Sequence, residues 1–301
     1  MAMLTFDNVY KKYGKKKVLS GFSLKCANEI LFLAGKNGAG KTTLIRGALG
    51  LERFDKGTVL YKNESEKYGS SKRKGVVFDT PCLYGQMSCQ QNIKIFCCGF
   101  EKDSCHVNSI LESLQIDKDL LRKKVSACSF GQQHRLSVAI ALIRKPVFLF
   151  LDEPSVGLDP FSWKLVREAI VNNNNEQGGC TIITGQDYLE MSEMSDRIAV
   201  LDKGTVQYLG KTQELLASLP GKYYMNVSGK ILNEKSLLLR DEKQEEDGSY
   251  SYLLPEKMPV ETAFSLASSQ GLSVLSISEK PKRLEDAIRK LLERRDGCQP
   301  Q

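Results

Sequence analysis

The chain of 301 residues is long enough for one large domain and a smaller one, and its 41% hydrophobic content supports a buried core. No apolar run approaches the ~18 residues of a membrane-spanning helix, and the N-terminus lacks a signal-peptide pattern. We therefore expect a soluble, cytosolic chain that reaches a membrane only through a partner; its net charge of +7 is concentrated in residues 1–80.

Two strands are predicted near the N-terminus, at residues 4–10 and 22–26, where apolar and polar residues alternate. Tyr13-Gly14 and three consecutive lysines at 15–17 lie between them. A tyrosine on such a loop can stack on a purine base or can simply cover the sheet, and the residues alone leave both open. The lysines can attract nucleic acid or anionic lipid. Because no aromatic residues are interleaved with them, we expect a solvated surface and no nucleic-acid partner.

A glycine-rich segment follows the apolar run 30–34 and leads into a helical pattern at 44–49; it reads Gly35-Lys36-Asn37-Gly38-Ala39-Gly40-Lys41-Thr42-Thr43. Its spacing, in strand–loop–helix order, is that of the Walker A phosphate loop. The glycines let backbone N–H groups face a phosphate, and the helix N-terminus adds its dipole. Lys41 supplies a full charge, and the Thr42 hydroxyl can ligate Mg²⁺. The segment predicts a site for a nucleoside triphosphate.

Short strands are predicted at residues 58–61 and 76–78, followed by a mostly helical stretch at 85–127. Five cysteines gather in this region beside His106: Cys82, Cys89, Cys97, Cys98 and Cys105. Their spacings fit no zinc template, so we interpret them as buried apolar thiols. The chain has 9 cysteines and no C-x-x-C pair, so a disulfide framework is not expected.

A helix is predicted to open at Ser129, because the apolar residues that follow have the helical period: Leu136, Ala139, Ile140 and Ile143. His134 lies within this helix and is expected at its surface. Pro146 ends the helix.

The next segment, residues 147–151, is an unbroken apolar run, which is typical of a central parallel strand covered on both faces. Asp152 and Glu153 follow it directly. Open α/β sheets bind their ligands at this edge of the strands. Asp152 is therefore predicted to hold Mg²⁺ and Glu153 to polarise an attacking water.

The remaining elements complete one nucleotide-binding domain, because the phosphate loop is not repeated. A helix is predicted over 162–171 and is broken by the asparagine run 172–175 and by Gly178-Gly179. A strand at 181–184 and a hairpin of 198–201 and 205–209 follow. Pro220-Gly221 marks a boundary. We predict domains of residues 1–219 and 220–301, the second a small α+β appendage with strands at 223–227, 249–253 and 272–277 and helices at 260–269 and 284–294.

At this point the sequence resembles the ATP-binding subunits of ABC transporters, most closely stand-alone subunits of bacterial exporters for peptide antibiotics (bacitracin, lantibiotics) and multidrug relatives. Over residues 3–215 the resemblance rests on the Walker A loop and on three further segments: Leu149-Phe150-Leu151-Asp152-Glu153-Pro154, Gly157-Leu158-Asp159-Pro160 and Ser129-Phe130-Gly131-Gln132. It implies an α/β fold of the P-loop NTPase type: a mainly parallel sheet, an antiparallel β subdomain and a helical subdomain at about 82–135.

The resemblance also implies an activity and partners. ATP and Mg²⁺ are the expected cofactors, and ATP hydrolysis is expected to drive a separate membrane permease, with export of a peptide or drug-like compound. The subunit is expected on the cytoplasmic face of the membrane, with residues 82–100 docked on the permease. A second ATP-binding subunit, identical or homologous, is expected to complete a head-to-tail dimer with Asp159 at its seam.

Roles transfer to the matching positions as implications of the resemblance. Glu153 would be the general base, with Gln186 and Lys41 as the other catalytic residues, and Mg²⁺ would be held by Thr42, Asp79 and Asp152. Tyr13 would stack on adenine. The nucleotide would contact Tyr13, Val18, Gly35, Asn37, Gly38, Ala39, Gly40, Lys41, Thr42, Thr43 and Asp79, and in the second subunit Ser129, Gly131 and Gln132.

Three departures from the family pattern stand out. Cys128 and Phe130 replace the leucine and first glycine of the usual Leu-Ser-Gly-Gly-Gln signature. Asp79 replaces a glutamine; it can still ligate Mg²⁺, although its charge opposes the γ-phosphate. Gln186 stands where a switch histidine follows Thr184-Gly185. Because glutamine cannot carry a charge at neutral pH, we expect slow hydrolysis.

Two alternative functions follow from these observations. The departures also suit an ATP-binding regulatory half of a heterodimeric transporter, with little hydrolysis of its own. The other alternative is a soluble ABC-type ATPase that acts on ribosomes or DNA. Such proteins usually carry two nucleotide domains or a long coiled-coil insertion, and the sequence shows neither.

Overall fold

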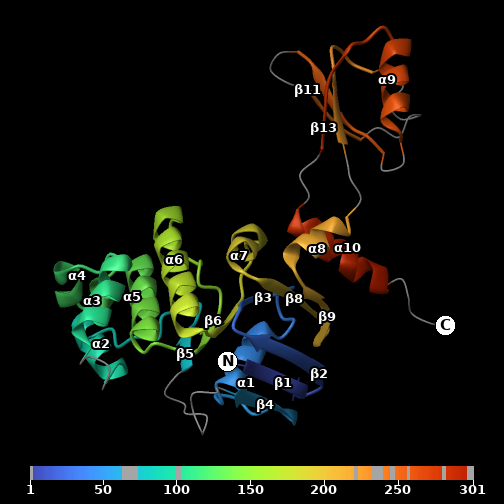
Figure 1. Cartoon of the computed structure of the whole chain (residues 1–301). Coiled ribbons are helices and arrows are strands. Elements are labelled where there is room, and N and C mark those ends of the chain that lie inside the picture. The colour runs from blue at the N-terminus through green and yellow to red at the C-terminus, as the bar shows by residue number, and fades with distance from the viewer. Residues whose placement is uncertain are drawn as a thin grey trace. The chain divides into compact units, whose positions relative to one another are not determined.

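The structure is a computed structural model that describes residues 3–62, 74–98, 103–219, 223–231, 240–244, 248–255, 258–279 and 283–296. The chain divides into two compact units (Figure 1). The first spans Met1–Thr212 and Leu291–Gln301, and the second spans Gln213–Lys290. The boundary predicted at residue 220 lies further along the chain, and residues 220–222 are outside the described ranges.

A six-stranded sheet forms the centre of the first unit. Its order is β5 (Lys74–Val77), β6 (Phe148–Leu151), β7 (Cys180–Ile183), β3 (Ile30–Gly35), β8 (Arg197–Asp202) and β9 (Thr205–Gly210). All neighbouring strands are parallel except β8 and β9. Every residue of β3, β6 and β7 is buried, and for β6 this is the burial that its unbroken apolar run predicted. The phosphate loop and the carboxylate pair therefore leave the sheet at its carboxyl edge.

A three-stranded antiparallel sheet accompanies it, with the order β2 (Lys16–Ala27), β1 (Met3–Tyr13) and β4 (Lys56–Lys62) (Figure 1). One hydrophobic core joins the two sheets and α1 (Lys41–Ala48). It includes Phe6 and Phe22 from the antiparallel sheet, Leu33 and Phe150 from the parallel sheet, and Leu44 from the helix. This core fixes the tip of the β1–β2 hairpin relative to the phosphate loop.

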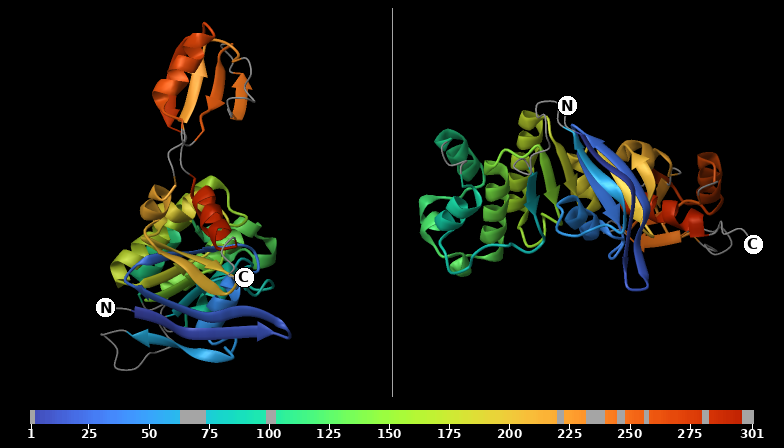
Figure 2. Two further views of the ribbon diagram at one scale, coloured as in Figure 1. Left: turned by 90° about the vertical axis from the view of Figure 1, so that its right-hand side faces the viewer. Right: turned by 90° about the horizontal axis from the view of Figure 1, so that it is seen from below.

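Helices gather at the side of the parallel sheet that carries β5 and β6 (Figures 1 and 2). They are α2 (Cys89–Phe96), α3 (Ser104–Ser113), α4 (Lys118–Arg122), a 3-10 turn (Val125–Ala127) and α5 (Phe130–Ile143). Ser129 caps α5, as predicted. Its hydroxyl accepts a hydrogen bond from the Gln132 N–H, and the Gln132 side chain accepts one from the Ser129 N–H, which is a capping box.

The helix α6 (Pro160–Gln177) corrects part of a prediction, because it continues through the asparagine run and ends only at the other predicted breaker, with Gly178 as its C-cap. Two of those asparagines are buried and make specific hydrogen bonds. The Asn173 amide donates to the Pro146 carbonyl at 3.2 Å, and Asn174 Oδ1 accepts from the Thr181 hydroxyl at 3.0 Å. These tertiary contacts outweigh the weak helix propensity of asparagine. Two short helices follow, α7 (Tyr188–Met194) and α8 (Thr212–Ala217).

The described residues of the second unit include a four-stranded antiparallel sheet and the helix that packs on it, which matches the α+β expectation. Its order is β11 (Arg240–Gln244), β12 (Tyr250–Leu253), β10 (Tyr223–Val227) and β13 (Val274–Glu279). Ala263 and Ala267 of α9 (Val260–Ser269) pack on Met225, Val227 and Tyr252 of the sheet. The last helix, α10 (Leu284–Asp296), contains the residue at which the second unit ends.

The cysteines differ from expectation in two respects. Cys26 of β2 and Cys180 of β7, both buried, form a disulfide, although no disulfide framework was expected. In the cluster interpreted as buried thiols, Cys89 and Cys97 are buried, but the other three are exposed: Cys82, Cys98 and Cys105. Within the described ranges, no helix combines the length and apolar character that crossing a bilayer requires.

Candidate nucleotide-binding site

The loop between β3 and α1 depends on glycine at two positions. Gly38 has φ 79° and Gly40, which precedes α1, has φ 108°, both in the region that favours glycine. A Cβ on Gly40 would also lie only 3.0 Å from the Leu19 side chain of the neighbouring hairpin. The backbone therefore turns tightly beneath the hairpin, as a loop that surrounds an anion requires.

Lys41, the first residue of α1, is 7% exposed and curls back into this loop. Its Nζ donates to the carbonyl oxygens of Gly35 at 2.7 Å and Lys36 at 3.2 Å. Burial lowers the pKa of Lys41, and the carboxylates of Glu153 and Asp152 oppose that shift. A cation in this position faces the concave side of the loop, where a bound phosphate would stabilise its charged form.

A cavity of about 500 Å³ opens above the loop. Eleven of the residues predicted to bind nucleotide or to act in catalysis line it: Tyr13, Val18, Asn37, Gly38, Gly40, Lys41, Thr42, Thr43, Asp79, Glu153 and Gln186. Gly35 and Ala39 belong to the loop but not to this lining, and Asp152 is buried behind it with 3% exposure. Segments that are distant in the sequence thus converge on one cavity.

Behind the cavity, Thr184 connects the Asp152 carboxylate to the backbone of Glu153. Its hydroxyl donates to Asp152 Oδ1 at 2.7 Å and accepts from the Glu153 N–H at 3.0 Å. Glu153 adopts φ 52°, an uncommon conformation for a residue with a side chain, and Gln186 Nε2 donates to its carboxylate at 2.9 Å. Asp152 is therefore fixed in the interior, while Glu153 lines the cavity.

Tyr13 lies at the tip of the β1–β2 hairpin and is 46% exposed. Its hydroxyl donates to the Glu52 carboxylate and lies 3.5 Å from the Thr43 hydroxyl. The ammonium of Lys11 is 5.2 Å from the centroid of its ring. These contacts hold the ring at the wall of the cavity, where a base can stack on it.

The remaining predicted residues are elsewhere: Ser129, Gly131 and Gln132 do not line this cavity. Ser129 is exposed at the N-terminus of α5. Phe130 is 42% exposed, and its ring packs on the loop after Glu153. The ring is so close to Gly157 that a Cβ added there would clash with it. Within one chain, the signature-like segment therefore belongs to a separate surface.

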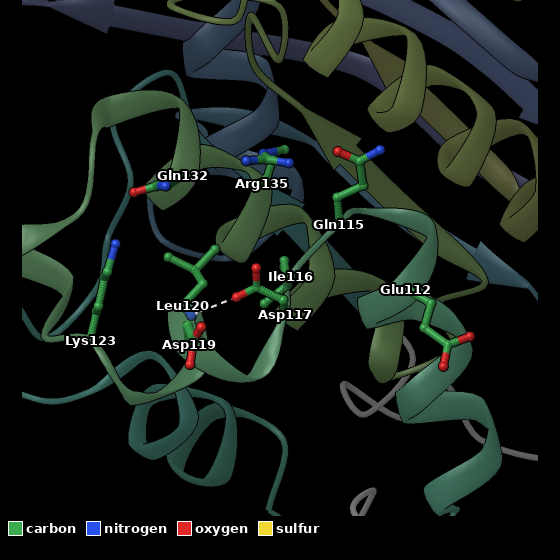
Figure 3. A pocket seen from close by; sticks show the side chains of 9 residues that line it. All are labelled: Glu112, Gln115, Ile116, Asp117, Asp119, Leu120, Lys123, Gln132 and Arg135. Carbon is green, nitrogen blue, oxygen red and sulfur yellow. Dashed lines mark hydrogen bonds between the residues drawn. The ribbon is translucent and has the colours of Figure 1, made fainter.

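A larger cavity of about 690 Å³ lies between α3, α4 and α5 (Figure 3). Its lining mixes acidic and basic side chains, including Asp117, Asp119 and Arg135, with Gln132. Asp117 is used locally, since its carboxylate accepts from the Leu120 N–H at 2.7 Å. This cavity contains no part of the phosphate loop, and only Gln132 among the predicted site residues reaches it.

Three residues at or near the site were misplaced or missed. His134 is fully buried, not on the surface of its helix, and neither ring nitrogen has a hydrogen-bond partner among the described residues. Burial lowers its pKa, and Asp79 opposes that shift. Lys16 lines the nucleotide cavity, although the sequence showed only a run of three lysines. For the bridging role of Thr184, the sequence contained only one indication, which is that this residue ends a predicted strand.

A glycine-rich loop between a strand and a helix, together with carboxylates at the end of a neighbouring parallel strand, is characteristic of phosphate-loop proteins that bind nucleoside triphosphates. The fold and the site described above belong to that class. The ABC transporter family model matches residues 19–156. A daunorubicin resistance ATP-binding protein of Streptomyces coeruleorubidus is 34% identical over 72% of this chain and 71% of its own. The chain belongs to the ATP-binding proteins of ABC transporters.

Two further comparisons extend the match. An uncharacterised ABC transporter ATP-binding protein of Bacillus subtilis is 28% identical over 94% of both chains, so the similarity includes the second unit. The structure of a subunit from a Clostridium perfringens transporter complex, 26% identical, matches 71% of this chain and 90% of its own with TM-score 0.61. Membership of the family implies that the chain binds and hydrolyses ATP.

Proposed function

We propose that this chain hydrolyses Mg-ATP slowly and that the cycle drives a separate membrane permease that exports a peptide or drug-like compound. The observation that carries the proposal is the arrangement of Lys41, Glu153 and Gln186 around one cavity. Lys41 would bind the phosphates, and Glu153 would accept a proton from the attacking water. Gln186 can hold the Glu153 carboxylate in place but adds no charge.

The donor set of the site suits magnesium. Thr42 and Asp79 line the cavity, and Asp152 is buried directly behind it. These are hydroxyl and carboxylate oxygens, the hard ligands that Mg²⁺ prefers. Mg²⁺ held there would neutralise part of the phosphate charge, while Thr184 keeps the Asp152 carboxylate oriented. Tyr13 and Val18 would contact the base.

A second ATP-binding subunit would complete each site. The supporting observation is that Ser129 and Gly131 begin α5 on a surface away from the cavity of their own chain. A helix N-terminus attracts anions, so the start of α5 can close over the γ-phosphate held by a second subunit. Asp159, which caps α6, follows the loop against which Phe130 packs, and we place it at the seam between subunits.

Export is favoured by relatives that are named for drug resistance, against daunorubicin and linearmycin. Relatives named as importers of sulfate, spermidine or iron also match, so the direction is part of the proposal. The permease would bind the helical side, around residues 82–100, and would hold the chain at the cytoplasmic face. Tyr84 is 52% exposed and Ile95 45% exposed there.

A second candidate function, the regulatory half of a heterodimer, is favoured by Phe130. Its ring occupies the surface beside the start of α5, where the family signature has glycine. With phenylalanine in place of glycine, the signature-like segment would fit less closely against the nucleotide that is bound by the second subunit. The chain would then hold ATP at one site and depend on a homologous subunit for turnover.

The test measures Mg-ATP binding by calorimetry and phosphate release by the full chain, alone and mixed with a candidate homologous subunit. We expect the wild-type chain to bind Mg-ATP and Lys41→Ala to lose binding. Glu153→Gln should bind but not hydrolyse. Turnover that appears only in the mixture would select the regulatory function, and identical behaviour of wild type and Lys41→Ala would contradict both.

A further inference from the structure

The tip of the β1–β2 hairpin carries a cation beside the nucleotide cavity. Tyr13 and Lys16 are direct partners in the antiparallel register, and Gly14 between them has φ 56°. Side chains of directly opposed residues lie on the same face of an antiparallel pair. Because the aromatic ring lies at the cavity wall, the Lys16 side chain extends on the same side. Both residues line the cavity.

Lys16 approaches the phosphate loop itself. Its Nζ lies 4.0 Å from the position that a Cβ on Gly38 would occupy. Apart from Gly38 and its two chain neighbours, no other heavy atom of the described residues lies within 4 Å of that point. Gly38 has φ 79° and itself lines the cavity. The ammonium therefore stands over the loop, whereas Lys41 is buried within it.

The neighbouring lysines differ in position but not in charge. Lys15 and Lys17 are exposed, as Lys16 is, yet neither lines the cavity. Among the described residues, no ion pair includes any of these three lysines. The cavity also contains the carboxylates of Asp79 and Glu153, which repel an incoming polyanion. A second cation at its mouth would offset that repulsion.

We propose that Lys16 is a second phosphate-binding residue of this site, which attracts the polyphosphate of a nucleotide and holds it from the hairpin side. This inference rests on the proposed function, since it needs a nucleotide in the cavity. A lysine ammonium suits the task because it is a compact charge on a flexible stem and needs no fixed geometry. The hairpin then contributes two contacts, the Tyr13 ring to the base and Lys16 to the phosphates. The ligand class is a nucleoside di- or triphosphate.

The experiment compares three variants that each remove one positive charge: Lys16→Gln, Lys15→Gln and Lys17→Gln. Affinities for Mg-ATP, Mg-ADP and AMP are measured by calorimetry at low and high salt. We expect Lys16→Gln to weaken Mg-ATP binding about two- to fivefold at low salt, the range of an exposed charge pair. The loss should be smaller for AMP and should shrink at high salt. Both control variants should bind as the wild type does.

Hydrolysis provides a second readout. Lys16→Gln should raise KM with kcat nearly unchanged, because an early contact with the phosphates stabilises the bound substrate and the transition state alike. Equal effects of all three variants would overturn the inference, since they would report net charge alone. Unchanged affinity in Lys16→Gln would overturn it as well, and the proposed function would stand. Failure of the wild type to bind Mg-ATP would instead reject the proposed function.

Discussion

The side-chain amide of Gln186 donates a hydrogen bond of 2.9 Å to the carboxylate of Glu153. The donor follows β7 and the acceptor follows β6, which are adjacent parallel strands. The residue that replaces the family's switch histidine thus retains a contact with the proposed base. It can orient the carboxylate, but it cannot gain or lose a proton at neutral pH. This difference between orientation and charge can be tested.

Gln186→His should raise the turnover number, because an imidazole can both hold Glu153 and carry charge as the bond to the γ-phosphate breaks. General acid–base groups contribute about 10²–10⁴ in rate, and we expect a gain of about tenfold from a histidine placed without other adjustments. Gln186→Leu, which removes the hydrogen bond, should fall below wild type. Steady-state phosphate release measures both variants. An unchanged kcat in Gln186→His would show that another step limits turnover.

Thr184→Val should disrupt the carboxylate pair without a large change in volume. The buried Asp152 carboxylate loses the donor at 2.7 Å, and the Glu153 N–H loses its acceptor at 3.0 Å. Leaving a buried polar group unsatisfied costs about 1–3 kcal/mol of unfolding free energy. We expect that loss in urea unfolding, together with a higher Mg²⁺ requirement for hydrolysis. Thr184→Ser keeps the hydroxyl and should retain both properties; equal losses in the two variants would contradict the bridging role.

The sequence predicted those parts of the site whose residues are consecutive in the chain. Gly35 to Thr43 form one continuous segment from the end of β3 to the start of α1, and Asp152 and Glu153 directly follow an apolar strand, so local pattern was sufficient. The burial of the strand after Pro146 followed from its apolar run, but the order of the strands in the sheet was not predicted. The resemblance to a known family supplied the residues that no local pattern could connect, such as Tyr13 and Gln186.

The sequence-based predictions were wrong where contacts with residues distant in the sequence determine the local structure. The α6 asparagines were expected to end a helix, but Asn173 and Asn174 are satisfied by partners on other elements. Cys26 and Cys180 are separated by 154 residues, and spacing cannot pair them. Lys16 differs from Lys15 and Lys17 only because hairpin register directs it to the cavity. Each of these features depends on tertiary contacts, which the local hydrophobic periodicity of the sequence does not reveal.

Gly157→Ala should destabilise the surface beside the signature-like segment. Gly157 has φ 72°, and an added Cβ would clash with the Phe130 ring. Together the left-handed backbone and the overpacking should cost about 2 kcal/mol or more in urea unfolding. Gly50→Ala is the matched control, because Gly50 has φ 75° with nothing within 4 Å of the added Cβ.

Phe130→Ala, combined with Gly157→Ala, separates the two costs. Phe130→Ala has its own packing cost, so the Gly157→Ala substitution is measured in both backgrounds as a double-mutant cycle. In the Phe130→Ala background it should cost only about as much as Gly50→Ala does in wild type. An equal cost of Gly157→Ala in the two backgrounds would contradict the contact between Phe130 and this loop. Comparing Phe130→Ala alone with wild type in the mixed-subunit ATPase assay then tests whether the ring weakens turnover.

His134 should make folding stability depend on pH. The ring is fully buried beside Phe130, and burial lowers the pKa of His134 from 6.5, although the carboxylate of Asp79 opposes the shift. In the unfolded chain the imidazole returns to a pKa of about 6.5. Below that pH the unfolded state therefore binds a proton that the folded state rejects, which lowers the unfolding free energy as pH falls.

The predicted slope from this single residue is at most about 1.4 kcal/mol per pH unit, and it should appear only below pH ~6.5, down to the lowered pKa of the folded state. His134→Gln should remove it, because an amide does not titrate. His106→Gln is the control, since His106 is partly buried with Nε2 3.3 Å from the Leu142 carbonyl oxygen. Urea unfolding between pH 7.5 and 5.5 measures the slopes. If wild type and His134→Gln lose stability in parallel, the acid sensitivity does not come from His134.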